Sequence, residues 1–536
     1  MKFVPGGPPR FRHQRLGLHK LITNHGVAAL LFDAGTGKTA TVLDYASLLA
    51  LKSPTGEARV LVVCPLVAVD TWVLQAETFL SPQVSWWAEA LGGSIRAKAA
   101  ALADRGGNPF PASSPAVSDD ARRRKPAPRA LHRRRAIAFA SSKPVDGPDE
   151  LPAPRLLLEV VNVDAFASRA RVGRRATAAD LIVEAVQRFA PDLVVVDESH
   201  RIKSPTGNAS RTLAKLTPAV RRRVILTGTV MPHSPLDVYG QWRFLDPTAF
   251  GETRPDGRWH SLSYGRFKDR YAIVGGWMGR EILGFKNLDE MQQVMAAAAV
   301  VVRKKDALDL PPTTDVIIPV ELSSAEKRAY SDMKKQLATQ FASGALASVP
   351  NRLTQLLRLR QITAGHLPDD AGVVHVIGDA KARTVRSLVH DTLAGETRVV
   401  VFALFTVEIA QLRRALAEPG TEVLVISGGT PMEERGAIRR RFGSADPARL
   451  VLVAQIKTMS LAINELVTAS HAVFATLSQQ RDDLTQAKAR LDRQGQTKPV
   501  TFWFCLAPHT VDEVVLASHR DRTDLETAML QHISTT

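Results

Sequence analysis

The chain has few cysteines and no long hydrophobic run, and both absences narrow what it can be. Only two cysteines, Cys64 and Cys505, occur among its 536 residues, and each sits in an apolar run. They predict buried free thiols in a reducing compartment, and they give no basis for a disulfide framework or a zinc site. No stretch of roughly 18 or more apolar residues appears, so no membrane span is expected. The N-terminus lacks the apolar segment of a signal peptide, and we expect a cytoplasmic protein.

Acidic residues are outnumbered by basic ones. Lys and Arg total 70 against 53 Asp and Glu, which gives a formal net charge of +17 and a pI of about 10.1. Such an excess favours a polyanionic partner and steers association with it, and we expect nucleic acid. A dispersed, solvated basic surface would give the same total charge.

Short apolar runs alternate with helical patterns along the chain, in two sets. The first set is 27–32, 60–64, 193–196 and 224–226, and the second is 399–402, 423–426, 450–453, 472–475 and 501–504. Strands this apolar predict parallel sheets covered on both faces. The stretch between them, from about 250 to 395, is mostly helical in pattern. We therefore predict an α/β fold of two parallel-sheet lobes in tandem with a helical region between them.

This pattern predicts four segments. They are a first lobe at 1–250, a helical protrusion and linker at 251–375, a second lobe at 376–515 and a C-terminal helix or tail at 516–536. Residues from about 92 to 155 are rich in Ala, Pro, Ser and Arg, and 121–135 carry eight basic residues and no acidic one. That composition predicts a disordered or loosely held insertion in the first lobe. It is either a passive loop or a basic arm on DNA phosphates.

A glycine-containing loop, residues 33–39, follows the first apolar run and precedes a helical pattern. Its glycines let backbone N–H groups curl around phosphate oxygens. Lys38 would neutralise the β- and γ-phosphates, and the Thr39 hydroxyl would ligate Mg²⁺. The usual first glycine of such loops is replaced by Phe32. The loop predicts an ATP site that comprises Gly35, Thr36, Gly37, Lys38 and Thr39.

A second apolar run ends in two carboxylates, Asp197 and Glu198. A buried parallel strand delivers such side chains at its C-terminal end, where α/β sheets bind ligands. Asp197 would hold Mg²⁺ through water, and Glu198 would orient or deprotonate the attacking water. Taken alone, an Asp-Glu pair after a strand is often a helix N-cap, and the phosphate loop upstream favours the catalytic interpretation.

Several motifs, in order along the chain, resemble the Swi/Snf-type DNA-dependent ATPases of helicase superfamily two, the DNA translocases. The likeness runs from about residue 10 to 515, and it is strongest to short stand-alone forms in bacteria and their viruses. Residues 197–204, DESHRIKS, are similar to the family's DEAHRIKN, and 226–229 are its LTGT. Residues 356–362, LLRLRQI, and 493–500, RQGQTKPV, are similar to its LLRLRQIC and RIGQTKPV.

The resemblance implies an ATP- and Mg²⁺-dependent motor that translocates on duplex or branched DNA through sequence-independent backbone contacts. Gln14 would recognise adenine. No reader domain is apparent, so DNA structure or a partner protein would supply targeting. The residues implied to couple the nucleotide to DNA are His200, Thr227, Gly228, Thr229 and Gln486. Those implied to contact DNA are Pro65, Leu66, Lys203, Phe405 and Thr406.

Two arginines follow Gln486 at helical spacing. Gln486, Arg490 and Arg493 fall at i, i+4 and i+7, so a continuous helix would present all three on one face. Periodicity alone equally fits a solvated basic helix. The resemblance implies that this face points toward the γ-phosphate held by the first lobe, with Arg493 as arginine finger and Arg490 supporting it.

One departure from the family pattern leaves other functions open. Residues 457–464 contain no glycine, although the corresponding family segment is glycine-rich. A nucleotide-gated DNA-binding protein with weak or no motor activity is therefore one alternative. A strand-separating DNA helicase is another, and it would need a hairpin or wedge, for which 251–300 is a poorly constrained candidate.

Overall fold

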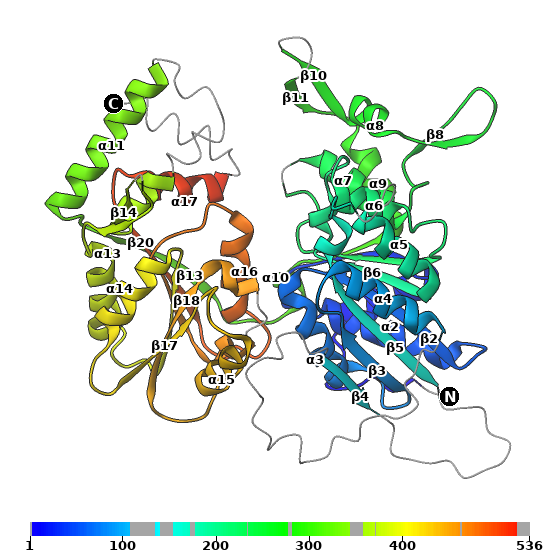
Figure 1. The fold of residues 1–536 in the computed structure, drawn as a ribbon, viewed down its shortest axis with the longest axis horizontal. Helices are drawn as coiled ribbons and strands as arrows, with labels where there is room; N and C mark the ends of the chain where they lie inside the picture. The colour runs from blue at the N-terminus through cyan, green and yellow to red at the C-terminus, as the bar shows by residue number, and fades with distance from the viewer. Residues whose placement is uncertain are drawn as a thin grey trace. The chain divides into compact units, whose positions relative to one another are not determined.

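A computed structural model describes residues 3–107, 135–139, 154–171, 177–232, 234–276, 281–342, 357–369, 371–460 and 464–521. The chain divides into two compact units, Met1–Leu308 and Asp309–Thr536. Figure 1 shows a strand-and-helix core in each unit. Among the described residues, no helix is both long enough and apolar enough to cross a bilayer.

The first unit is built on one sheet with the strand order β12-β1-β7-β6-β2-β5-β3-β4. All neighbouring strands are parallel except β4, which runs antiparallel to β3. The strands are β1 (Val27–Phe32), β2 (Glu57–Cys64), β3 (Ser85–Ala90), β4 (Arg135–Phe139), β5 (Arg155–Asn162), β6 (Leu193–Asp197), β7 (Arg222–Leu226) and β12 (Ala299–Val302).

Helices cover both faces of this sheet. The helices are α1 (Arg12–Thr23), α2 (Lys38–Lys52), α3 (Val69–Phe79), α4 (Ile95–Gly107), α5 (Ala178–Phe189), α6 (Asn208–Ala214) and α7 (Val238–Leu245). Alternate residues of β1 enter two separate cores: Leu30 packs with α1–α3, and Leu31 packs with α4–α7. Because both faces of the strands are buried, the strands read as continuous apolar runs.

Beyond α7 the first unit extends into a protrusion of short elements. The elements are β8 (Gly251–Thr253), β9 (Trp259–Ser261), α8 (Tyr264–Tyr271), β10 (Ala272–Gly275), β11 (Glu281–Phe285) and α9 (Leu288–Ala298). Two antiparallel hairpins, β8–β9 and β10–β11, stand out from it in Figure 1. The chain then returns as β12 to pair with β1, and α10 (Lys304–Ala307) follows.

The second unit contains an all-parallel sheet with the order β13-β20-β19-β16-β18-β17. Its strands are β13 (Thr313–Pro319), β16 (Arg398–Ala403), β17 (Thr421–Ile426), β18 (Arg449–Gln455), β19 (His471–Phe474) and β20 (Val500–Leu506). The helices are α11 (Ser324–Ala342), α13 (Ala380–Ser387), α14 (Thr406–Leu416), α15 (Met432–Phe442), α16 (Arg481–Leu491) and α17 (Val511–Asp521). The short hairpin β14 (His366–Pro368) with β15 (Val374–Val376) lies outside the sheet.

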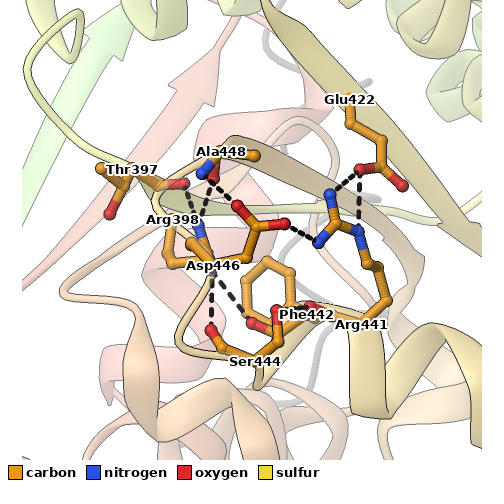
Figure 2. A network of polar contacts seen from close by, with 8 residues as sticks. All are labelled: Thr397, Arg398, Glu422, Arg441, Phe442, Ser444, Asp446 and Ala448. Atoms are coloured by element: carbon orange, nitrogen blue, oxygen red, sulfur yellow. Dashed lines mark hydrogen bonds and ion pairs between the residues drawn. The ribbon is translucent and has the colours of Figure 1, made fainter.

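An arginine at the start of β16 organises one end of this sheet (Figure 2). The buried Arg398 guanidinium donates to the carbonyls of Phe442 at 3.0 Å and Ser444 at 3.0 Å, among others of the loop that joins α15 to β18. Arg441 pairs with Asp446 of that loop and with Glu422 of β17, both at 2.5 Å. The Arg398 bonds satisfy backbone carbonyls at this end of the sheet, and the Arg441 ion pairs join the loop to β17.

The prediction of two parallel sheets in tandem is confirmed, and each of the nine predicted apolar runs forms a strand. The boundary between the units, Leu308 to Asp309, falls inside the stretch predicted as helical. That stretch also contributes β12 and β13 to the two sheets. β12, with the sequence AVVV, is apolar but directly follows the apolar end of α9, and β13, TTDVIIP, begins with three polar residues, so neither stands out as a separate apolar run.

The prediction of a disordered or loosely held insertion at about 92–155 is wrong for residues 95–107. Residues 95–107 form α4, which packs on α5 and buries Leu102 fully. Its buried residues, Lys98, Ala99, Ala101 and Leu102, fall at helical spacing, which an overall composition does not reveal. The basic residues 121–134 lie outside the described part of the chain, so their role stays a prediction.

Candidate nucleotide-binding site

The predicted phosphate loop connects the end of β1 at Phe32 to the start of α2 at Lys38. Gly35 and Gly37 have φ values of 84° and 88°, a left-handed conformation that side chains disfavour. A Cβ on Gly37 would also lie 2.0 Å from Nε2 of Gln14. Both glycines are therefore required by the backbone path, as the sequence predicts for a loop that curls around an anion.

The side chains of Lys38 and Thr36 both donate hydrogen bonds to backbone carbonyls at the start of the loop. The Lys38 ammonium donates to the carbonyl of Phe32 at 2.7 Å, so the cation is folded back over the loop. Thr36 is 1% exposed, and its hydroxyl donates to the carbonyl of Asp33 at 2.8 Å. The loop is braced from within while Lys38 and Thr39, the first residues of α2, stay partly exposed.

Gln14 and His13 of α1 brace the same loop from outside. Nε2 of Gln14 donates to the carbonyl of Thr36 at 3.3 Å, and its Oε1 accepts from the backbone N–H of Phe11 at 3.0 Å. Nε2 of His13 lies 2.8 Å from the same Thr36 carbonyl. The adenine-reading role implied for Gln14 stays a prediction, and the contacts assign Gln14 a loop-bracing role.

The two predicted carboxylates stand at the end of β6, beside β7 and β2. Oδ1 of Asp197 accepts from the N–H of Glu198 at 2.9 Å, and Oδ2 accepts from Nε1 of Trp72 at 2.9 Å. Burial, reinforced by the negative charge of Glu198, raises the pKa of Asp197 to about 6. The positive charge of Lys38 acts on that pKa in the opposite direction, so the ammonium lies within electrostatic range of the carboxylate.

Glu198 is linked to the coupling residues through His200. Glu198 adopts φ 50°, and its Oε2 lies 3.3 Å from Nδ1 of His200. The same His200 nitrogen lies 3.3 Å from Oγ1 of Thr227. Thr227 is fully buried and its hydroxyl both donates to the carbonyl and accepts from the N–H of Thr229, at 3.1 and 3.0 Å. Glu198, His200, Thr227 and Thr229 therefore form one contiguous polar chain within the first unit.

Gly228 places this chain against the phosphate loop. A Cβ on Gly228 would meet the carbonyl of Phe32 at 3.3 Å and the backbone nitrogen of Ala34 at 3.6 Å. The N–H of Thr227 donates to the carbonyl of Leu30 on β1 at 3.3 Å. The loop after β7 thus approaches the phosphate loop closely at Gly228.

The strand β12 reaches the phosphate loop from the opposite side. The N–H of Asp33 donates to the carbonyl of Val302 at 3.0 Å, and Oδ2 of Asp33 accepts from the N–H of Lys304 at 2.9 Å. The first residue of the loop is therefore hydrogen-bonded to the segment by which the chain leaves this unit.

Three buried residues of the site were not predicted: Trp72, Ser199 and Gln241. The Ser199 hydroxyl donates to Oε1 of Gln241 at 2.7 Å. Nε2 of Gln241 donates to the carbonyls of Val230 at 2.6 Å and Asp237 at 2.9 Å. This bridge joins the loop after β6 to the loop after β7. Gln241 is fully buried between apolar neighbours on α7, and a polar residue at that position is the one signal in the sequence.

The residues implied to contact DNA lie at element ends in both units. Pro65 and Leu66 follow β2, Leu66 is 66% exposed, and Lys203 follows the short 3₁₀ turn after Glu198. Phe405 and Thr406 begin α14 in the second unit, where the buried carboxylate of Glu408 accepts from the N–H groups of Leu404 at 2.9 Å and Phe405 at 3.3 Å. Their contacts with DNA stay predictions.

The predicted arginine face requires a correction. Gln486 and Arg490 lie on α16, but the helix ends at Leu491 and Arg493 lies on the following turn. Asp492 leaves the helical conformation with ψ 84°, and a turn with Gly495 at φ 98° follows it. Burial lowers the pKa of Arg493, and the nearby carboxylate of Glu465 opposes that shift. Arg493 is thus presented by a turn rather than by the helix face.

The side chains present fit a Mg²⁺ ion that arrives with a nucleotide. Mg²⁺ is usually held by one or two protein oxygens plus phosphates and waters, rather than by an all-protein cage. Thr39 and Asp197 supply a hydroxyl and a carboxylate with acceptor capacity left beyond its two hydrogen bonds. Among the described residues, no group of three or more His, Cys, Asp or Glu could hold a metal by itself.

Comparisons with known proteins identify relatives of this chain. A family model described as SNF2-related domain matches residues 179–366. The bovine "DNA annealing helicase and endonuclease ZRANB3" is 26% identical over 349 residues, which is 64% of this chain and 30% of that protein. The Mycoplasma genitalium "Uncharacterized ATP-dependent helicase MG018" is 24% identical over 339 residues, which is 62% of this chain and 30% of that protein.

A shorter relative and a solved structure also match. "Putative protein p41" of Acyrthosiphon pisum secondary endosymbiont phage 1 is 26% identical over 347 residues, covering 63% of this chain and 72% of p41. The "Sulfolobus solfataricus SWI2/SNF2 ATPase core in complex with dsDNA" covers 97% of this chain and 93% of that chain at 17% identity, with a TM-score of 0.36. The chain thus spans about 30% of the length of the ZRANB3 and MG018 relatives and most of p41.

Proposed function

We propose that this chain, which contains an SNF2-related domain, is an ATP-driven motor that translocates on duplex or branched DNA. The observation that carries the proposal is the convergence of three separate segments at one edge of the first sheet. Lys38 acts electrostatically on Asp197 at the end of β6, and the adjacent Glu198 is linked through His200 to Thr227 after β7. A nucleotide site coupled to a second loop is what a motor requires.

The first unit supplies the groups for ATP hydrolysis in this proposal. The N–H groups of the loop and the ammonium of Lys38 bind phosphate oxygens, and Thr39 and Asp197 hold the Mg²⁺ of the nucleotide complex. The ion, when bound, neutralises charge that develops on the phosphates. Glu198 accepts a proton from the attacking water or orients it, and His200 positions the Glu198 carboxylate from 3.3 Å away.

In this proposal, the contacts around Gly228 link movement of the phosphate loop to movement of the loop after β7. Any shift of the phosphate loop presses on Gly228 and is passed through Thr227 and His200 to Glu198.

We assign to the second unit the cations Arg490 and Arg493, which act on the nucleotide when the units close around it. DNA binding by both units, helped by the net charge of +17, converts this cycle into movement. A partner protein that supplies targeting, and a cytoplasmic location in a bacterial or phage-infected cell, belong to the same proposal.

A second candidate function, strand separation, is favoured by the hairpin β10–β11. Its base is anchored, because Ala272 and Phe285 pack on the core of the first unit. Further out, Val274 pairs with Ile282 and both are more than two-fifths exposed, at 41% and 44%. Leu283 is 66% exposed. An apolar hairpin that projects from a motor lobe is the element that a strand-separating helicase needs to stack on a terminal base pair.

Steady-state ATPase assays with five nucleic-acid conditions test the motor proposal. The conditions are none, single-stranded DNA, duplex DNA, forked DNA and RNA, with Glu198→Gln as the inactive control. We expect duplex or forked DNA to stimulate turnover more than RNA does. Equal rates with and without DNA would refute the motor and favour the nucleotide-gated DNA-binding protein.

Fork unwinding distinguishes the second candidate. Val274→Ser combined with Leu283→Ser should abolish strand displacement while DNA-stimulated ATP hydrolysis persists. A wild-type chain that hydrolyses ATP on forked DNA but releases no strand is a translocase without helicase activity.

A further inference from the structure

One tryptophan reaches the carboxylate that ends β6. Trp72 lies on α3 and is 1% exposed, within the core that α3 shares with β1 and β2. Its Nε1–H donates to Oδ2 of Asp197 at 2.9 Å, although the two residues are 125 positions apart in the sequence. An indole N–H is a donor only, so burying it stabilises the fold only where an acceptor is built for it.

This bond helps to fix the plane of the Asp197 carboxylate. The other oxygen, Oδ1, accepts from the N–H of Glu198 at 2.9 Å. The two donors come from different elements, so the carboxylate cannot rotate without losing at least one of them. An ionised carboxylate has about four acceptor positions, so both oxygens keep capacity for a water or a metal-bound water.

We propose that Trp72 is a positioning residue that holds Asp197 in the orientation required by the hydrated Mg²⁺ of a nucleotide complex. The inference rests on the proposed function, because it takes Asp197 as the carboxylate that faces the metal. Trp72 does not itself touch the nucleotide. Its loss should therefore weaken the contribution of Mg²⁺ to nucleotide binding and leave metal-free binding unchanged.

The same unit contains a matched control. Trp242 on α7 is also 1% exposed, and among the described residues its Nε1 has no hydrogen-bond partner. Trp72→Phe and Trp242→Phe each remove the same atoms from a buried site, but only Trp72→Phe breaks a hydrogen bond. The difference between the two variants separates the bond from the effect of lost packing.

Calorimetric titration of ADP into the full chain measures the effect without relying on turnover. Wild type, Trp72→Phe and Trp242→Phe are compared over a series of Mg²⁺ concentrations and in EDTA. Loss of a hydrogen-bond partner behind a metal-facing carboxylate typically lowers metal affinity by roughly 10- to 100-fold. We expect Trp72→Phe to raise the Mg²⁺ concentration at half-maximal effect by about tenfold. The ADP affinity in EDTA should stay unchanged, and Trp242→Phe should change neither quantity.

Two outcomes overturn the proposal. One is an equal Mg²⁺ shift in both variants, and the other is a loss of ADP affinity in EDTA as large as the loss in Mg²⁺. Should Trp72→Phe fail to fold, site-specific incorporation of β-(3-benzothienyl)alanine at position 72 keeps the bicyclic shape and replaces the N–H with sulfur. The same Mg²⁺ shift is then expected, and its absence refutes the role. A wild-type chain that binds ADP equally well with and without Mg²⁺ would instead refute the proposed function.

Discussion

Ser199→Ala should destabilise the first unit although it restores the alanine of the family's DEAH motif. The Ser199 hydroxyl and its acceptor, Oε1 of Gln241, are both fully buried, and the bond between them is 2.7 Å long. Alanine leaves that oxygen without its donor. Gln241 cannot turn away to water, because its amide nitrogen is bonded to Val230 and Asp237. An acceptor left unsatisfied in this way costs about 1–3 kcal/mol.

Urea unfolding of the full chain, followed by far-ultraviolet circular dichroism, measures this cost. The matched variants are Gln241→Met and the double substitution Ser199→Ala with Gln241→Met, which together form a double-mutant cycle. We expect the double variant to be less destabilised than the sum of the single variants, because it removes donor and acceptor together. A Ser199→Ala chain as stable as wild type, with no coupling in the cycle, would refute the reasoning.

Three further predictions concern catalysis and DNA binding. Lys38→Ala should weaken nucleotide affinity, whereas Glu198→Gln should retain ATP but stop its hydrolysis, and normal hydrolysis by Glu198→Gln would refute its role. Arg493→Ala should lower DNA-stimulated kcat by on the order of 10³ with much less effect on nucleotide Kd, and turnover within about threefold of wild type would make Arg493 a structural cation. Deletion of 121–135 should flatten the salt dependence of DNA affinity measured by fluorescence anisotropy, and an unchanged log–log slope would leave this segment a passive loop.

The central strands could be predicted from the sequence because burial on both faces leaves an unmistakable apolar run. β16, for example, is buried at every position from Arg398 to Ala403. β12 (AVVV) is apolar but merges with the apolar end of α9, and β13 (TTDVIIP) is apolar only in its second half, so neither can be separated from the surrounding helical pattern. Their pairing is decided by long-range register with β1 and β20, which a local pattern does not encode.

The candidate site likewise contains residues that the sequence indicates and residues that it does not. Lys38, at the start of α2, and Asp197, at the end of β6, could be singled out from the sequence because a phosphate site needs particular groups near the ends of strands. Trp72 and Gln241 could not be predicted, because each is placed in the site by a hydrogen bond to a residue far away in the sequence. Trp72 bonds to Asp197, 125 residues away, and Gln241 bonds to Ser199, 42 residues away. The position of Arg493 was predicted incorrectly, because helical periodicity says nothing of where a helix stops.

The hydrogen bonds between Asp33 and the segment after β12 have a mechanical consequence. Residues 303–308 are the last of the first unit, so the tether that continues into the second unit starts at the phosphate loop itself. Tension along that segment acts on β12 through the backbone and on Asp33 through the N–H of Lys304. The proposed phosphate loop is therefore also a point at which the connection to the second unit is anchored.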